Sequence, residues 1–267
     1  MKNSTEPASG SFSKATGTQS IHRALAILKT VAKYNENGAR LSQIAQEVGF
    51  HTATVHRILT ILLEEGWVTL NPASKGYHLG FELFVLGRAA RQFNLQEVLR
   101  GALERIADQT EDSTYLVIQS GYNVLCLDRV VGKFPIQVLT FEIGERRPMG
   151  IGAGSLALLA SLPDHQVEAI IKSNANRYKT FNRTADDVKG SVAQCRRLGY
   201  GLSVKTVSPD TIGVGATVKD PEGQVAAAIS VAGIAKRMGP ERRGAIIRLI
   251  NEEIAAVDKK SLKGIEP

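Results

Sequence analysis

The chain has 267 residues, of which 43% are hydrophobic, and its formal net charge at pH 7 is +7. This length suffices for one large or two ordinary domains with substantial cores, and no apolar run approaches the ~20 residues that a membrane-spanning helix needs. Two cysteines are too few for a disulfide framework or a metal cluster, so we expect a cytoplasmic protein without cofactor, metal or membrane partner.

The basic charge, with a pI of about 9.4, suits a polyanionic partner. It is not concentrated, because residues 1–90 carry nine basic and six acidic side chains. Charge therefore argues weakly, and local motifs must carry the inference. Residues 1–19 are polar and rich in serine and threonine, without the apolar stretch of a signal peptide, and predict a flexible N-terminal arm.

The first predicted helix runs from Ser20, whose hydroxyl can cap it, to about Tyr34. Its apolar residues, from Ile21 to Val31, follow the i, i+3, i+4, i+7 spacing of one buried face. Arg23, near its start, is either a phosphate contact or an ordinary structural arginine.

Two short helices are predicted between Leu41 and Gly66, because the apolar residues of each half repeat the same spacing. Between them, Gly49 can adopt the positive φ that ends a helix, and Thr52 can cap the next helix. The turn of about three residues is typical of a helix-turn-helix. An ordinary helical hairpin with a solvated polar face has the same pattern.

The stretch after Gly66 favours DNA binding over that plain hairpin. Residues 67–70 and 77–79 are β-prone, and turn formers with a basic residue, Lys75, lie between them. Two helices followed by such a hairpin form a winged helix-turn-helix, which we assign to residues 20–80.

The candidate DNA contacts lie on the second helix of the motif, at the start of the first, and in the wing. The outward face of residues 52–63 carries small or hydrogen-bonding groups and one cation, so it can enter a major groove without repelling phosphate. For His56 the alternative is a histidine that is merely exposed on a helix. The candidates are Ser42, Gln43, His51, Thr52, Thr54, His56, Arg57, Thr60 and Lys75.

Residues 81–110 are predicted as linker helices, over 80–92 and 94–110. The first is apolar on more than one side, at Phe81, Phe84 and Leu86. This surplus predicts burial against a second subunit or against the next domain.

From Ser113 onward the pattern changes to period two and to continuous apolar runs, which predict strands. The order of strands, helices, strands and a last helix predicts an antiparallel α+β domain over residues 111–260. We expect strands at 114–120, 124–131, 136–144, 201–206, 213–218 and 225–232, and helices at 155–161, 164–173, 184–198 and 240–257.

Several short motifs occur in a fixed order along the chain. They are Ser20–Leu28, Thr54–Leu59, Glu64–Val68, Cys126–Val130, Gly144–Pro148, Gly199–Tyr200 and Val225–Val231. With these motifs the chain resembles the IclR (isocitrate lyase regulator) family of bacterial transcription factors from about Ser20 to Asp258. The resemblance implies a winged helix-turn-helix, a linker helix and a C-terminal GAF-like effector domain. It also implies homodimers or dimers of dimers that bind palindromic double-stranded operators and respond to small carboxylates, often aromatic.

The resemblance further implies an effector site. In the best-known small-acid binders, the polar positions of the pocket match Ser203, Gly213, Ser230 and Ala232, and this chain keeps only Ser230. The lost volume and charge favour a larger, more apolar ligand, such as an aromatic or branched carboxylate. Backbone amides at a helix start can bind its carboxylate, and these belong to Gly152, Ala153, Gly154 and Ser155.

Enzymatic classes fit the sequence less well. The glycine-rich residues 150–155 lack the lysine of a P-loop and the downstream acid of a dinucleotide fingerprint. Cys126 and Cys195 have no histidine within several residues and are expected in the core. Asp128 and Arg129 are expected to form a structural or interface ion pair. The remaining alternative to a regulator is a small-molecule-binding or catalytic domain with a vestigial helix-turn-helix.

Overall fold

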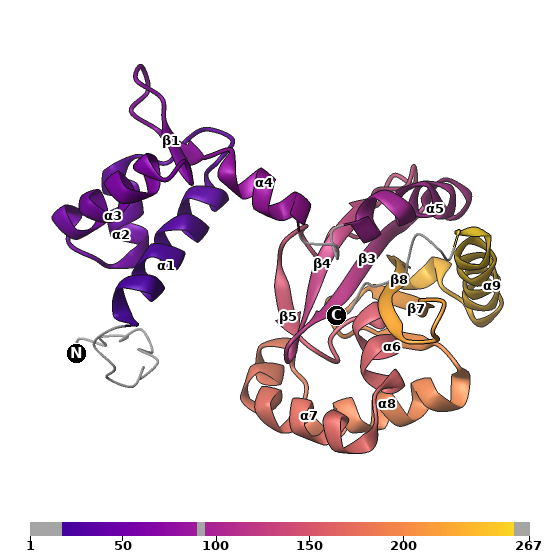
Figure 1. Cartoon of the computed structure of the whole chain (residues 1–267). Helices are drawn as coiled ribbons and strands as arrows, with labels where there is room; N and C mark the ends of the chain where they lie inside the picture. The colour runs from indigo at the N-terminus through magenta and orange to yellow at the C-terminus, as the bar shows by residue number, and fades with distance from the viewer. Residues whose placement is uncertain (1–17, 90–93, 259–267) are drawn as a thin grey trace. The chain divides into compact units, whose positions relative to one another are not determined.

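The computed structural model describes residues 18–89 and 94–258, which divide into two compact units with separate hydrophobic cores (Figure 1). The units comprise Met1–Ala90 and Arg91–Pro267. Most of the expected N-terminal arm, residues 1–17, lies outside the described residues. None of the described helices is long and apolar enough to cross a membrane.

The N-terminal unit is a winged helix-turn-helix. Helices α1 (Gln19–Lys33), α2 (Leu41–Val48) and α3 (Thr52–Glu64) enclose its core, and strands β1 (Val68–Leu70) and β2 (Tyr77–Leu79) pair antiparallel as the wing. The predicted apolar faces of α2 and α3 are buried or half-buried, with Ile44, Val55 and Leu59 fully enclosed. The face predicted for α1 is wrong at Ile21 and Leu25, which are 60% and 48% exposed, because α1 turns Ile27 and Val31 into the core instead. Tyr77 and Ala39 exchange two backbone hydrogen bonds of 2.9 Å, which tie the wing to the segment before α2.

Two predicted helix caps were misplaced, Ser20 by two residues and Thr52 by one. Helix α1 begins at Gln19, so Ser20 lies inside the helix and does not precede it. Thr52 is the first residue of α3, and His51 occupies the N-cap position without a side-chain cap hydrogen bond. The predicted end of α2 is confirmed, because Gly49 has a φ of 69°. A run of several polar residues before an apolar pattern therefore predicts that a helix begins there, but it does not identify the first residue of the helix.

Helix α4 (Glu82–Ala89) covers the described part of the expected helix 80–92; its remaining residues, 90–93, lie outside the described chain. Phe81, Phe84 and Leu86 are 71%, 56% and 49% exposed. The predicted apolar surplus is therefore exposed on the N-terminal unit taken by itself.

The C-terminal unit is built on one antiparallel sheet in the order β5-β4-β3-β8-β7-β6. Its strands are β3 (Ser113–Ser120), β4 (Asn123–Val130), β5 (Arg146–Pro148), β6 (Gly201–Val204), β7 (Thr211–Lys219) and β8 (Val225–Ile234). Its helices are α5 (Asn94–Thr110), α6 (Ala153–Ser161), α7 (Asp164–Tyr178), α8 (Ala185–Leu198) and α9 (Pro240–Ala256), with short 3-10 turns η2 (Lys179–Phe181) and η3 (Ala235–Arg237). The predicted antiparallel α+β class is confirmed.

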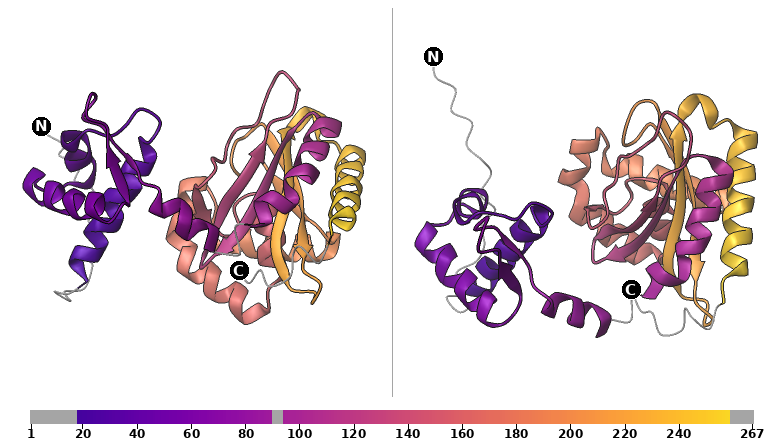
Figure 2. Two further views of the ribbon diagram at one scale, coloured as in Figure 1. Left: turned by 45° about the horizontal axis from the view of Figure 1, so that its top comes forward. Right: turned by 90° about the horizontal axis from the view of Figure 1, so that it is seen from above.

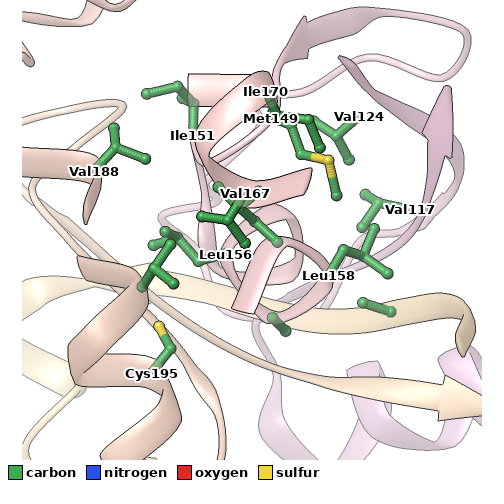
Figure 3. Close-up of a cluster of buried hydrophobic side chains, with 14 of the residues drawn as sticks. Val117, Val124, Met149, Ile151, Leu156, Leu158, Val167, Ile170, Val188 and Cys195 are labelled. Carbon is green, nitrogen blue, oxygen red and sulfur yellow. The ribbon is translucent and has the colours of Figure 1, made fainter. Parts of the chain in front are cut away.

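Helices cover both faces of this sheet. Helices α5 and α9 lie side by side on one face, and α6, α7 and α8 lie on the other (Figures 1 and 2). Successive residues of a strand face opposite sides. Leu116 therefore joins the α5–α9 core, whereas Val117 joins the α6–α8 core, whose side chains gather around Leu156 and Val167 (Figure 3).

The expected linker helix 94–110 is part of the C-terminal unit. Leu95, Leu99 and Leu103 of α5 are buried in the sheet core. Arg100 of α5 also donates to Asp128 of β4 at 3.0 Å. The assignment of all of residues 81–110 to a linker is therefore corrected.

The expected Asp128–Arg129 ion pair is also wrong, because the Arg129 side chain bonds to Glu142 (2.9 Å).

The expected strand 136–144 is absent. This stretch, which we call the cover segment, has no regular secondary structure. Its burial does not alternate as in a strand, because its buried residues, Val138 and Phe141, are three positions apart. The edge of β4 is already paired, because β5 lies beside it and Gly144 donates to Cys126. The cover segment therefore runs without a strand partner.

Candidate functional site

Helix α3 presents an exposed polar edge. His56, Arg57 and Thr60 are exposed and Thr54 is half-buried, between buried apolar neighbours. His51 and Thr52, at the start of the helix, are exposed as well. Since α3 has no carboxylate before Glu64, this edge is compatible with the phosphates that flank a major groove.

The beginning of α2 offers a second polar surface. Ser42 is exposed and Gln43 is half-buried, in the first turn, where backbone amides lack partners within the helix. Arg40, which the sequence interpretation did not select, is exposed at the N-cap of this helix. The sequence contains the information needed to select Arg40. A basic residue directly before a helix adds positive charge to the helix N-terminus, which already favours anions.

The wing presents Lys75 on an ordered turn. The Asn71 side chain accepts hydrogen bonds from the amides of Ala73 (2.9 Å) and Ser74 (3.2 Å). Lys75 has a φ of 57°, and its amide donates to the Asn71 carbonyl at 2.9 Å. The lysine is exposed, so a phosphate contact requires no unfolding of the turn.

Two of the side chains considered for DNA have partners inside the protein. The Arg23 guanidinium lies over the Phe50 ring, 5.4 Å from its centroid, which gives this arginine a structural contact. The Thr60 hydroxyl donates to the His56 carbonyl at 3.0 Å. Only its acceptor lone pairs therefore remain available to DNA.

The C-terminal unit contains a cavity of about 60 Å³ between the start of α6, strands β3, β7 and β8, and the cover segment. All the predicted effector residues line it, although they come from four elements, which are the start of α6 and strands β6, β7 and β8. They are Gly152, Ala153, Gly154, Ser155, Ser203, Gly213, Ser230 and Ala232.

The start of α6 lies very close to the sheet at this cavity. A Cβ on Gly154 would be 2.8 Å from Val117 and 3.1 Å from the Ser230 hydroxyl. Glycine therefore brings the helix start into contact with β3 and β8. The Ser155 hydroxyl accepts from the Gly150 amide at 2.7 Å, so it holds the preceding loop in addition to lining the cavity.

The sequence interpretation missed the charged residue of the cavity, Arg147. Its side chain is 10% exposed, and its guanidinium lies 4.3 Å from the centroid of the Phe141 ring. Tyr115, also missed, donates its hydroxyl to the Val138 carbonyl, and burial raises its pKa. A signal existed in two adjacent arginines at the start of a strand, since one of them must face inward.

The cavity is smaller than the expected ligand. Cavities that take up benzene in other proteins have volumes of about 150 Å³. As it stands, the cavity therefore suits a ligand of a few heavy atoms, and an aromatic acid requires a wall to move. The cover segment is the wall that no strand ladder holds.

The cysteines have the core positions expected for them. Cys126 is fully buried, and burial raises its pKa to about 12. Burial also raises the pKa of Cys195, whose sulfur accepts from the Leu202 amide at 3.4 Å. Among the described residues, no three histidine, cysteine or acidic side chains are grouped so that they could hold a metal ion.

Two family models match consecutive parts of the chain. The IclR helix-turn-helix domain matches residues 20–72, and the bacterial transcriptional regulator IclR C-terminal domain matches residues 87–259. The chain belongs to the IclR family of bacterial transcriptional regulators. As a family member it is a DNA-binding protein that regulates transcription.

Individual members of the IclR family agree with this assignment. The HTH-type transcriptional regulator TtgV of Pseudomonas putida is 34% identical over 186 residues, 67% of this chain and 70% of that protein. The transcriptional repressor IclR of Escherichia coli is 26% identical over 234 residues, 85% of each chain. An IclR homologue of Microbacterium hydrocarbonoxydans complexed with 4-hydroxybenzoate has the same fold, with a TM-score of 0.76 at 20% identity over 92% of this chain and 99% of that one.

Proposed function

We propose that this regulator binds a palindromic operator through α3 and changes its operator affinity when a small carboxylate occupies the cavity. One observation carries the proposal. The same chain holds a winged helix with a carboxylate-free polar edge and, in its other unit, a cavity with a buried arginine. The first matches DNA, and the second matches a small anion.

The effector is proposed to be an aromatic or branched carboxylate. The predominantly small and apolar lining of the cavity supports this class, and so does the 4-hydroxybenzoate bound to a homologue. Regulation requires that the acid bind two arrangements of the protein with different affinity. The small volume of the cavity is consistent with a second, more open arrangement around the cover segment.

Self-association as a homodimer or a dimer of dimers completes the proposal. Exposed Phe81, Phe84 and Leu86 at α4 supply an apolar surface for it. A two-fold dimer would present two copies of α3 to the two halves of a palindrome. We further propose that the protein acts in the cytoplasm, where bacterial DNA lies, and catalyses no reaction.

Genomic-fragment binding with the full-length protein, repeated over aromatic and aliphatic carboxylates, tests this function. A specific fragment whose affinity changes with one acid is the expected result. If no fragment binds above the non-specific background at moderate salt, the regulator proposal fails. The alternative, a catalytic or ligand-binding unit with a vestigial helix-turn-helix, would then be tested by turnover of the same acids.

Single substitutions test the assigned DNA surface. Arg57→Ala should cost about 1–3 kcal/mol of operator binding if Arg57 reads a base, and Lys75→Ala should lower the magnitude of the salt slope by about one per wing. Lys219→Ala, an exposed lysine of the C-terminal unit, is the matched control. Equal effects of Lys75→Ala and Lys219→Ala would exclude a wing contact.

A further inference from the structure

The buried arginine of the cavity is already paired with a carboxylate of its own chain. Glu145 accepts hydrogen bonds from Arg147, with Oε1 2.8 Å from Nε and Oε2 3.3 Å from Nη2. This two-point arrangement is the one in which a guanidinium binds a free carboxylate. The Nε/Nη2 edge of Arg147, one of the two edges with which a guanidinium binds a carboxylate, is therefore occupied from within.

The two partners differ in how readily they can leave. Arg147 is 10% exposed and is held over Phe141, on a strand residue paired with Val124. Glu145 is 37% exposed and lies just before that strand. The carboxylate can turn toward water at modest cost, whereas the guanidinium would lose its ring contact and its place in the core.

The same carboxylate also fastens the end of the cover segment. Glu145 Oε2 accepts from the Glu142 amide at 2.9 Å, and the Glu145 amide donates to the Glu142 carbonyl at 3.0 Å. Glu142 follows Phe141, whose side chain forms part of the cavity wall. One acidic side chain thus links the cavity arginine to the wall that must move for a larger ligand.

We propose that Glu145 is an internal competitor for the effector's carboxylate at Arg147, and that its displacement frees the Glu142 amide at the end of the cover segment. This inference rests on the proposed function and narrows it to anionic ligands. A carboxylate that binds the Nε/Nη2 edge of Arg147 takes the place of Glu145, whose Oε2 then no longer holds the Glu142 amide. A neutral amide of the same shape has no charge with which to displace it.

Chemical rescue tests the competition directly. Glu145→Ala leaves Arg147 without its carboxylate, so acetate or benzoate should raise the melting temperature of the full-length variant, while acetamide or benzamide should not. The concentration of acid that gives half of the shift should be roughly tenfold or more lower than for the wild type. Ionic strength is matched with chloride in every sample.

Three variants serve as controls. Glu145→Ala/Arg147→Met should show no acid-specific shift, because the anchor is gone. Glu142→Gln changes a neighbouring acid that pairs with Arg129 and should respond as the wild type does. Ala232→Leu narrows the cavity, because Ala232 lines it. Added to Glu145→Ala, it should reduce the melting-temperature shift with benzoate more than the shift with acetate.

Amide hydrogen exchange tests the release. The peptide containing Glu142 should exchange faster in Glu145→Ala than in the wild type, and benzoate should increase its exchange in the wild type. Equal shifts with acid and amide, an acid preference that survives Arg147→Met, or no shift with either acid would each overturn the inference. Operator binding is measured on the same preparations. If Arg147→Met still shows the acid-specific melting-temperature shift, the inference about Glu145 fails and the proposed function stands. If the protein binds no operator, the proposed function fails and the inference about Glu145 stands.

Discussion

The pair between Arg100 and Asp128 should respond very differently to the loss of each partner, because only one of them is buried. Arg100 Nη1 donates to both carboxylate oxygens of Asp128, at 3.0 and 3.1 Å. The Asp128 side chain is 1% exposed and that of Arg100 is 44% exposed. Apart from Arg100, the donor to this carboxylate is the Arg129 amide at 2.7 Å.

Arg100→Met therefore leaves a carboxylate inside the protein with one backbone donor. The expected loss is about 3–5 kcal/mol of unfolding free energy, the range found when one partner of a buried pair is removed. Asp128→Asn removes the charge and leaves Arg100 with Glu104 (2.8 Å) and water, so it should cost about 1 kcal/mol. The double variant Arg100→Met/Asp128→Asn has no buried charge without a partner. Its loss of unfolding free energy should therefore approach that of Asp128→Asn alone.

Urea unfolding with two probes measures these losses in the full-length protein. Far-ultraviolet circular dichroism follows both units, whereas fluorescence follows Trp67, the one tryptophan of the sequence, in the N-terminal core. Arg100→Met should shift the circular dichroism transition and leave the Trp67 transition in place. The reasoning is refuted if Arg100→Met costs no more than Asp128→Asn, or if the double variant is no more stable than Arg100→Met.

Three further outcomes follow from single sites. Gly201→Ala places a Cβ 2.1 Å from a backbone oxygen of α6 and should cost about 1–3 kcal/mol or more in urea unfolding; a neutral result would show that helix and sheet can separate there. Thr184 and Asp187 form a capping box, and the hydrogen bonds from Thr184 lower the pKa of the Asp187 carboxyl. The ionised carboxylate therefore stabilises the folded protein at pH values above the ordinary carboxyl pKa. This stabilisation is lost as the pH falls through the lowered pKa of the folded state. Asp187→Asn should therefore lower the melting temperature at neutral pH and not in strong acid, and equal effects at both would contradict this. Cys126 and Cys195 should resist a thiol reagent at mildly alkaline pH until urea is added, and rapid labelling of the native protein would disprove their burial.

Periodicity was sufficient to predict α3 and the wing, because their stability depends on local spacing and on one buried face. It also showed that residues 94–110 form an amphipathic helix. It could not show which core receives the apolar face of that helix, since this depends on contacts with strands far along the chain. The actual partner of Asp128, Arg100, was hidden for the same reason.

The cavity illustrates a second limit. The family resemblance led to Ser203, Gly213 and Ser230, because those positions follow from the alignment of motifs along the chain. Arg147 was missed because its direction depends on strand register, and a shift of one residue would have pointed Arg146 inward instead. The cover segment was mistaken for a strand because its apolar and polar residues largely alternate in the sequence, although its buried residues, Val138 and Phe141, are three positions apart and no strand pairs with it.

The two walls of the cavity tolerate sequence change unequally. On one side Gly154 lines the cavity, and Gly201 and Gly215 lie behind it against the start of α6. An added Cβ on any of the three would be within 3 Å of a neighbouring atom. On the other side Val138 and Phe141 reach the cavity from a backbone outside the sheet. As this lineage diverges, changes of ligand preference should accumulate in residues 136–144, while selection for folding keeps the glycine wall constant. The cover segment is accordingly the stretch in which to randomise residues when a sensor for a new acid is wanted.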